Sequence, residues 1–256
     1  MNRHKTKIFK FCVGCFISLS FLVPTLLKAQ AVFGEVKYTQ TNDWTKIATA
    51  LPYLSQEEKD RIQFSWGKGR GYSEKMRLLF NDSTSYYSYI QDDKSEESIW
   101  SYKKNTFEIN RNFRLNKVQD RIGLLGKNYL VKDEIPKRKW KIHNEIKEVS
   151  GYVCMKAETY DSIKSQRIVA WFTDKILVPA GPAEFGGLPG LILEIDINDQ
   201  SSLITAEEVK LNTQTLWPKS NTKGKAIDYK KYQSIVKTYI ADCIERRRNP
   251  FWDLRY

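Results

Sequence analysis

Cys154 and Cys243 are the two cysteines beyond the N-terminal thirty residues, and they carry the most distinctive chemistry in the chain. Cys154 falls in an alternating, strand-like segment, and Cys243 falls on the apolar face of a predicted helix. A disulfide between them would close a long loop and stabilise the fold by about 2–4 kcal/mol. One alternative to the disulfide is that the two thiols are buried separately. A second, weaker alternative is a site for a soft metal ion, because two thiolates without a nearby histidine make an incomplete ligand set. We take the disulfide as a hypothesis and predict no metal site.

Few other side chains suit catalysis. The chain has two histidines, and His143 is the one outside the N-terminal segment, so a zinc-type histidine cluster cannot be assembled. Glu194 and Asp196 would project from the same face of a strand, but the wet face of a strand is the simpler interpretation of that pair. The Ser-x-x-Lys pattern recurs along the chain, for example at Ser101/Lys104, Ser220/Lys223 and Ser234/Lys237, and is too common to indicate a nucleophile. We therefore predict no catalytic residues and no cofactor.

Residues 179–190 hold seven of the 21 Gly and Pro residues in twelve positions. Pro fixes φ and Gly permits φ > 0, so this composition specifies one tight path. Apolar residues inside the segment indicate that it packs back on the core. One interpretation is an ordered corner between two strands, and the other is a loop that presents backbone N–H groups or an apolar knob to a partner. The candidate binding residues are those of its second half: Phe185, Gly186, Gly187, Leu188, Pro189 and Gly190.

The same segment carries a family resemblance. Gly187-Leu188-Pro189-Gly190-Leu191-Ile192 resembles the hallmark of the GLPGLI family of secreted bacterial proteins. Further stretches are similar to that family's motifs in the same order: residues 151–157 (Gly-Tyr-Val-Cys-Met-Lys-Ala), residues 170–174 (Ala-Trp-Phe-Thr-Asp), and Gly181-Pro182 with Phe185. The family usually has Ile-Pro where this chain has Ile176-Leu177, so the loop departs locally. The resemblance implies an envelope location and brings no established activity and no catalytic residues.

Most of the candidate residues named above lie on or beside segments that the sequence predicts as strands. Alternating or β-branched segments occur at 32–39, 75–80, 86–90, 106–111, 129–132, 152–158, 168–173, 191–197 and 203–211. The segment 191–197 alternates most cleanly and predicts a half-buried strand. Ser55 and Glu58 indicate a helix start within residues 43–62, and Asp228 caps a predicted amphipathic helix. The pattern predicts a mainly β fold: a curved antiparallel sheet or half-barrel with helical segments near the N-terminus and at the C-terminus.

Residues 1–29 have the order of a cleavable export signal. Basic residues without an acidic one precede an apolar run at 11–27, and Ala29 stands before Gln30. The run is short for a membrane span, which needs about 20 apolar residues; an uncleaved anchor is the alternative. Residues 30–256 then form a single β-rich domain of 227 residues, with 37 Lys and Arg against 30 Asp and Glu, a net charge of +7. That excess permits contact with an anionic membrane surface and gives no reason to expect nucleic acid.

These features predict a non-catalytic binding or accessory protein of the bacterial cell envelope. We expect it to be exported, to the periplasm or the outer membrane of a Gram-negative bacterium. An envelope hydrolase that uses carboxylates or Cys154 is one alternative, and a structural envelope component is another. The expected partner is an envelope protein or a small apolar ligand. Peripheral membrane contact and the oligomeric state stay open.

N-terminal sequencing of the exported protein tests the predicted signal. The sequence should begin at or near Gln30, because cleavage follows the small residue that ends the apolar run. An exported protein that still begins with Met1 would contradict the prediction and favour the anchor.

Overall fold

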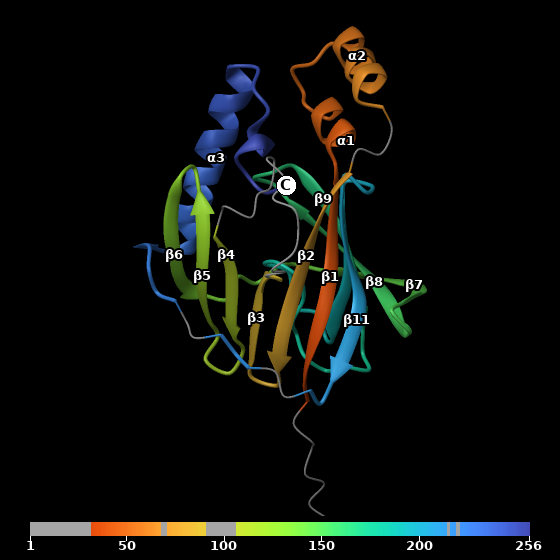
Figure 1. Cartoon of the computed structure of the whole chain (residues 1–256), viewed down its shortest axis with the longest axis vertical. Coiled ribbons are helices and arrows are strands. Elements are labelled where there is room, and N and C mark those ends of the chain that lie inside the picture. Colours follow the sequence, from red (N-terminus) through yellow and green to blue (C-terminus); the bar gives the residue numbers. More distant parts are fainter. Residues whose placement is uncertain (1–31, 68–70, 91–105, 214–215, 219–220) are drawn as a thin grey trace, which may run out of the picture. The chain divides into compact units, whose positions relative to one another are not determined.

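The computed structural model describes residues 32–67, 71–90, 106–213, 216–218 and 221–256, so the predicted signal at 1–29 lies outside the described residues. Figure 1 shows strands dominating the fold. The strands are β1 (Phe33–Asp43), β2 (Gly71–Asn81), β3 (Thr84–Tyr89), β4 (Phe107–Asn112), β5 (Lys117–Leu124), β6 (Lys127–Glu134), β7 (Lys141–Val149), β8 (Tyr152–Asp161), β9 (Gln166–Thr173), β10 (Leu191–Ile197), β11 (Ser202–Leu211) and β12 (Lys225–Ile227). The helices are α1 (Trp44–Thr49), α2 (Gln56–Trp66) and α3 (Tyr229–Glu245), with a short 3-10 turn at Pro250–Trp252. The predicted mainly β fold with helices near both ends is confirmed.

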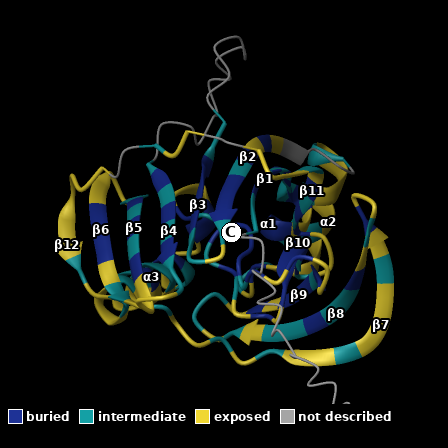
Figure 2. Cartoon of the chain, turned by 90° about the horizontal axis from the view of Figure 1, so that it is seen from below, coloured by how far each residue is buried: buried dark blue, intermediate teal, exposed yellow. Residues whose placement is uncertain are grey.

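Within the described residues, twelve strands form one sheet in the order β12-β6-β5-β4-β3-β2-β1-β11-β10-β9-β8-β7. Neighbouring strands pair antiparallel, except that the short strand β12 runs parallel to β6. The sheet is open, with β12 and β7 at its two edges. Figure 2 shows that it twists strongly, because β7 and β8 lie across the direction of β4, β5 and β6.

Strand β1 shows how the sequence gives the sheet one inner and one outer face. Every second residue of β1 is buried, including Val36 and Tyr38. Lys37 lies on the outer face, where its Nζ is 2.8 Å from the Glu208 carboxylate of β11. Successive side chains of a strand point to opposite faces, so this alternation buries one face of the sheet and leaves the other wet. Exposed ion pairs of this kind contribute little stability.

Three irregular or helical segments cover the inner face: the connection between β9 and β10, helix α3, and the C-terminal turn. Their apolar side chains join the core that the strands form, through Ile176, Val178, Phe185, Leu188, Val236, Phe251, Leu254 and Tyr256. Asp228 caps α3 and Ser55 forms a capping box with Glu58 at the start of α2, so both predicted helix starts are confirmed. No helix in the described part of the chain is long and apolar enough to cross a membrane.

Strand β10 is more deeply buried than its alternating sequence predicts. All of its residues except Asp196 are buried, and Glu194 is 8% exposed. The Nζ of Lys147, from β7, lies 2.5 Å from the Glu194 carboxylate and 4.5 Å from the centroid of the Trp171 ring. Long side chains therefore cover the outer face of this strand, and the prediction of a half-buried strand is wrong for that reason.

The Gly/Pro segment is an ordered corner that folds back on the sheet. The Gly187 N–H donates to the carbonyl oxygen of Pro179 (3.0 Å), and Gly187 has a φ of +84°, which favours glycine. At Gly190 a Cβ would lie 2.0 Å from the carbonyl oxygen of Thr173, so no larger residue fits without a backbone shift. Leu188 between them is 2% exposed. The corner joins β9 to β10 and places its buried side chains under the sheet.

Leu188→Ala should lower the free energy of unfolding by about 2–5 kcal/mol, because the substitution leaves a cavity in the core. Gly190→Ala should also destabilise the domain, since the Thr173 carbonyl occupies the space that a Cβ needs. Urea unfolding measures both effects, and Pro189→Ala, at an exposed position of the same corner, is the matched control. Unchanged unfolding midpoints for Leu188→Ala and Gly190→Ala would contradict this description of the corner.

The two cysteines do not pair in the structure. Cys154 on β8 and Cys243 on α3 are both buried and free. Cys154 faces the inner side of the sheet near Tyr38, whereas Cys243 lies beside Tyr239 on its own helix. The hypothesised disulfide is therefore replaced by the alternative of two separately buried thiols, because strand and helix direct the side chains into different neighbourhoods.

Thiol titration distinguishes the two states. The unfolded chain of residues 30–256, never exposed to reductant, should contain two reactive thiols, and the native protein should react slowly because Cys154 and Cys243 are both buried. A titration that finds no thiol in the unfolded protein would restore the disulfide.

Candidate functional site

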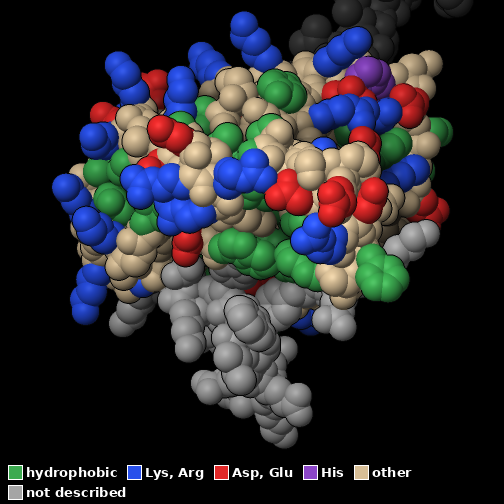
Figure 3. All heavy atoms as spheres, turned by 90° about the horizontal axis from the view of Figure 1, so that it is seen from above, with side chains coloured by type: hydrophobic (Ala, Val, Ile, Leu, Met, Phe, Trp, Pro, Cys, Tyr) green, Lys and Arg blue, Asp and Glu red, His purple; other side chains and the backbone are tan. Residues whose placement is uncertain are grey.

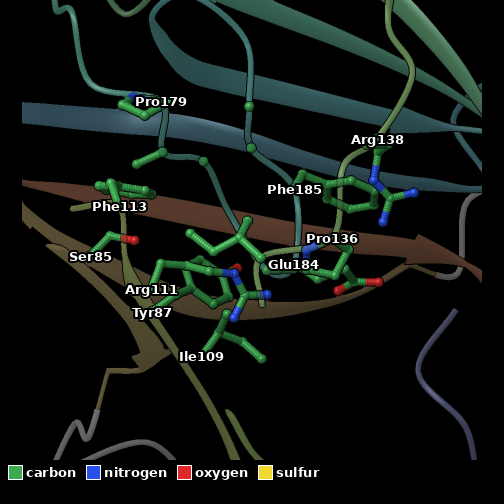
Figure 4. A pocket seen from close by; sticks show the side chains of 16 residues that line it. Ser85, Tyr87, Ile109, Arg111, Phe113, Pro136, Arg138, Pro179, Glu184 and Phe185 are labelled. Atoms are coloured by element: carbon green, nitrogen blue, oxygen red, sulfur yellow. The ribbon is translucent and has the colours of Figure 1, made fainter. Parts of the chain in front are cut away.

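A pocket of about 210 Å³ lies between the Gly/Pro corner and the inner face of the sheet. The pocket therefore suits a small molecule or one end of a longer one. Figure 4 shows side chains from strands and loops converging on it. The lining residues are Ser85, Tyr87, Ile109, Arg111, Phe113, Ile135, Pro136, Arg138, Pro179, Ala180, Gly181, Ala183, Glu184, Phe185, Gly186 and Gly187.

The register of β3 and β4 places four of these side chains on the inner face. Ser85 pairs with Arg111, and Tyr87 pairs with Ile109, across the antiparallel ladder. Residues two apart on a strand share a face, so a serine, a tyrosine, an arginine and an isoleucine form one contiguous wall. Each strand thus contributes both a polar and an apolar or aromatic group to the site.

A buried ion pair holds the arginine of this wall in place. The Nη1 of Arg111 donates to Oδ1 of Asp120 on β5, and the backbone N–H of Asn110 donates to the same oxygen (3.0 Å). Asp120 is 1% exposed; burial raises its pKa, and the positive charge of Arg111 opposes that effect. Because an isolated buried charge is costly, Asp120 fixes the position of the guanidinium group.

Two polar atoms at the pocket have no hydrogen-bond partner among the described residues: Nη2 of Arg111 and Oη of Tyr87. Arg111 is 9% exposed and Tyr87 is 1% exposed, so neither atom is exposed to bulk water. Burial raises the pKa of Tyr87, which keeps its hydroxyl protonated and able to donate. An unpaired buried donor costs free energy, so the two groups mark a place where an acceptor would be stabilised.

The corner and the β6–β7 connection form the opposite wall. The guanidinium carbon of Arg138 lies 5.0 Å from the centroid of the Phe185 ring, and Nε1 of Trp140 donates to the carbonyl oxygen of Gly186 (2.9 Å). Burial alone would raise the pKa of Glu184, but the positive charges of Lys164, Arg138 and Arg111 hold it below the usual range. Glu184 is therefore an ionised carboxylate at the pocket wall.

The structure brings three of the six predicted binding residues to the pocket. Phe185, Gly186 and Gly187 line it, whereas Leu188 and Gly190 are buried in the core and Pro189 is exposed outside the lining. The sequence analysis missed the strand residues Ser85, Tyr87 and Arg111 and the loop residues Arg138 and Glu184. Tyr87 and Arg111 fall in segments predicted as strands, but no motif separates them from other strand residues.

The other candidate groups do not form a site. Glu194 is paired with Lys147, and Asp196 accepts a hydrogen bond from a backbone N–H of the following turn. Burial raises the pKa of the Cys154 thiol to about 11, which disfavours the thiolate. His143 lies 3.6 Å from the Glu158 carboxylate, which also pairs with Lys156 and Arg167. The described residues contain no group of three or more His, Cys, Asp or Glu that could hold a metal ion.

A second hollow, of about 420 Å³, lies between the N-terminal helices and the C-terminal turn. Its aromatic side chains include Trp252, whose ring stacks on that of Trp44 at 4.9 Å. Figure 3, which views this end of the molecule, shows basic and acidic side chains interspersed with hydrophobic ones. Arg247 at this hollow is paired with Glu58 (2.8 Å). The loop pocket differs because it has an unpartnered donor on a charged arginine, whereas the unpartnered donor at this hollow is the amide Nδ2 of Asn249.

Comparisons with known proteins agree with this fold. Two solved structures, described as the structure of PNGF-II in the C2 and P21 space groups, are similar with a TM-score of 0.53 and 19% identity each. They match 80% and 81% of this chain, which spans about a third of their length (32% and 33%). No curated protein matches. Residues 76–234, more than half of the chain, match the family described as "N-glycanase peptide, N-terminal domain". The chain therefore belongs to the family of N-glycanase N-terminal domains.

Proposed function

We propose that the chain is an exported, non-catalytic binding module of the cell envelope whose loop pocket holds a small polar ligand or the polar end of a larger one. One observation carries the proposal: two residues that line the pocket, Arg111 and Tyr87, each keep a buried donor without a hydrogen-bond partner among the described residues. Most buried polar groups in folded proteins are hydrogen-bonded. A ligand acceptor would supply the missing partner and gain a strong, charge-assisted hydrogen bond from the guanidinium group.

The side chains that could catalyse hydrolysis are ion-paired or buried, and this favours a binding protein over a hydrolase. The carboxylate of Asp120 is occupied by Arg111, and that of Glu194 by Lys147. The thiol of Cys154 is buried, and its raised pKa keeps it protonated. Glu184 is ionised, but no histidine or cysteine stands beside it in the pocket lining. These groups serve structure or electrostatics, so a hydrolase is the less supported alternative.

Membership of the N-glycanase N-terminal domain family supports an accessory role. The family is named for one domain of a larger enzyme, and the similar PNGF-II chains are about three times as long as the part that matches. The proposed location in the periplasm or at the outer membrane rests on the sequence of residues 1–29 and on the resemblance to the GLPGLI family. Membership of the GLPGLI family is part of the same proposal.

A pocket-filling variant tests the proposed function. Ligand-observed NMR would measure binding of neutral monosaccharides, amino acids and short-chain carboxylates to the purified domain. At least one probe class should bind saturably to the wild type and lose at least tenfold in affinity in Ile135→Trp, because the indole would occupy the pocket from its rim. Lys139→Trp, at an exposed position outside the lining, is the matched control and should bind as the wild type does.

Two results would count against this proposal. The first is that no probe binds, or that binding is the same in Ile135→Trp as in the wild type. The second is release of the glycan from an N-linked glycopeptide by the purified chain, which would show that it is an enzyme. The glycopeptide assay is run on the same preparations, so folding and binding are verified together.

A further inference from the structure

We infer that the loop pocket selects small organic monocarboxylates that carry an apolar body. This inference rests on the proposed function and names its ligand class. The two donors without a partner, Nη2 of Arg111 and Oη of Tyr87, both lie at the pocket. Nη1 of Arg111 is bound to Asp120, so Nη2 is the guanidinium nitrogen left to donate, and its hydrogen bond to a charged acceptor is about twice as strong as one between neutral groups. A carboxylate is therefore the acceptor that this pair of donors fits best.

The charges around the pocket favour an anion with a single charge. The charged residues that line the pocket are Arg111, Arg138 and Glu184. The lining therefore carries two positive charges and one negative charge, an excess of one. A monoanion neutralises this excess in a partly desolvated site, whereas a cation or a dianion leaves an unpaired charge, which is costly there.

The remaining wall of the pocket is apolar and would contact the apolar body of the ligand. Ile109, Phe113 and Phe185 line it together with Ile135 and Pro136. Arg138 lies over the Phe185 ring, and this cation–π contact holds the ring against the corner. The volume of about 210 Å³ admits a short aliphatic or single-ring body. A carboxylate with one such body fills both the polar and the apolar part of the site.

Phenylacetate and its neutral, nearly isosteric amide, phenylacetamide, test the inference by isothermal titration calorimetry. The wild type should bind phenylacetate at least tenfold more tightly than phenylacetamide, because only the carboxylate completes the charge balance. Tyr87→Phe should weaken phenylacetate binding by about tenfold, as expected for a lost hydrogen bond to a charged group. Its thermal stability should be unchanged or higher, because the deleted hydroxyl has no partner in the described residues.

Tyr86→Phe is the matched control, since Tyr86 is the next residue on β3 and does not line the pocket. It should bind phenylacetate as the wild type does. Tyr87 is preferred to Arg111 for the test because removing Arg111 would leave the Asp120 charge buried without its partner.

The outcomes separate this inference from the proposed function. Equal affinity for phenylacetate and phenylacetamide would overturn the selection of anions, while the pocket would remain a binding site. Phenylacetate binding that is unaffected by Tyr87→Phe would place the carboxylate elsewhere and also overturn the inference. If phenylacetate does not bind, the inference fails, and the proposed function is then decided by the other probe classes and by Ile135→Trp.

Discussion

The open sheet has one apolar face, which must be buried away from water. The rest of this structure depends on the segments that cover that face. Both edges of the sheet are free of further strands in the described chain, so pairing cannot close it. The corner between β9 and β10, helix α3 and the C-terminal turn supply the cover. Each large apolar side chain that they bury stabilises the fold by about 1.5–3 kcal/mol. The cover is made partly of irregular chain, so its backbone polar groups also need partners.

Those partners come from the neighbouring β6–β7 connection and from the cover itself. The Nε1 of Trp140 in that connection donates to the carbonyl oxygen of Gly186 (2.9 Å), and the Gly187 N–H donates to that of Pro179 (3.0 Å). Charged side chains buried under the cover are paired, as with Arg255, which binds Glu74 (3.1 Å) and Gln40 (2.7 Å). The pairing is incomplete at several places in the described residues, for example at Oε1 of Glu74. At the loop pocket it leaves one guanidinium nitrogen and one hydroxyl without a partner.

The matched part of the chain contains the whole pocket. Its lining extends from Ser85 to Gly187, and the match to the family of N-glycanase N-terminal domains covers residues 76–234. Helices α1 and α2 and the aromatic hollow beside them lie at least partly outside the match. The corner, the pocket and strands β3 to β12 thus lie within the matched residues, whereas β1 and the first residues of β2 precede them, and the proposed binding function belongs to the matched part.

The sequence by itself determined the local features of this protein. Alternation with period two indicated the strands, Ser55 and Asp228 indicated helix starts, and the density of Gly and Pro indicated an ordered corner. These signals are readable because each depends on residues near in the chain. Which side chains meet depended on the tertiary structure. The register of β3 and β4 and the path of the corner brought Arg111, Tyr87 and Glu184 to one pocket, although up to 97 positions separate them in the sequence. The same long-range packing buried Glu194 and kept the two cysteines apart, because burial and proximity are set by the segments that cover a residue and not by its neighbours in the chain.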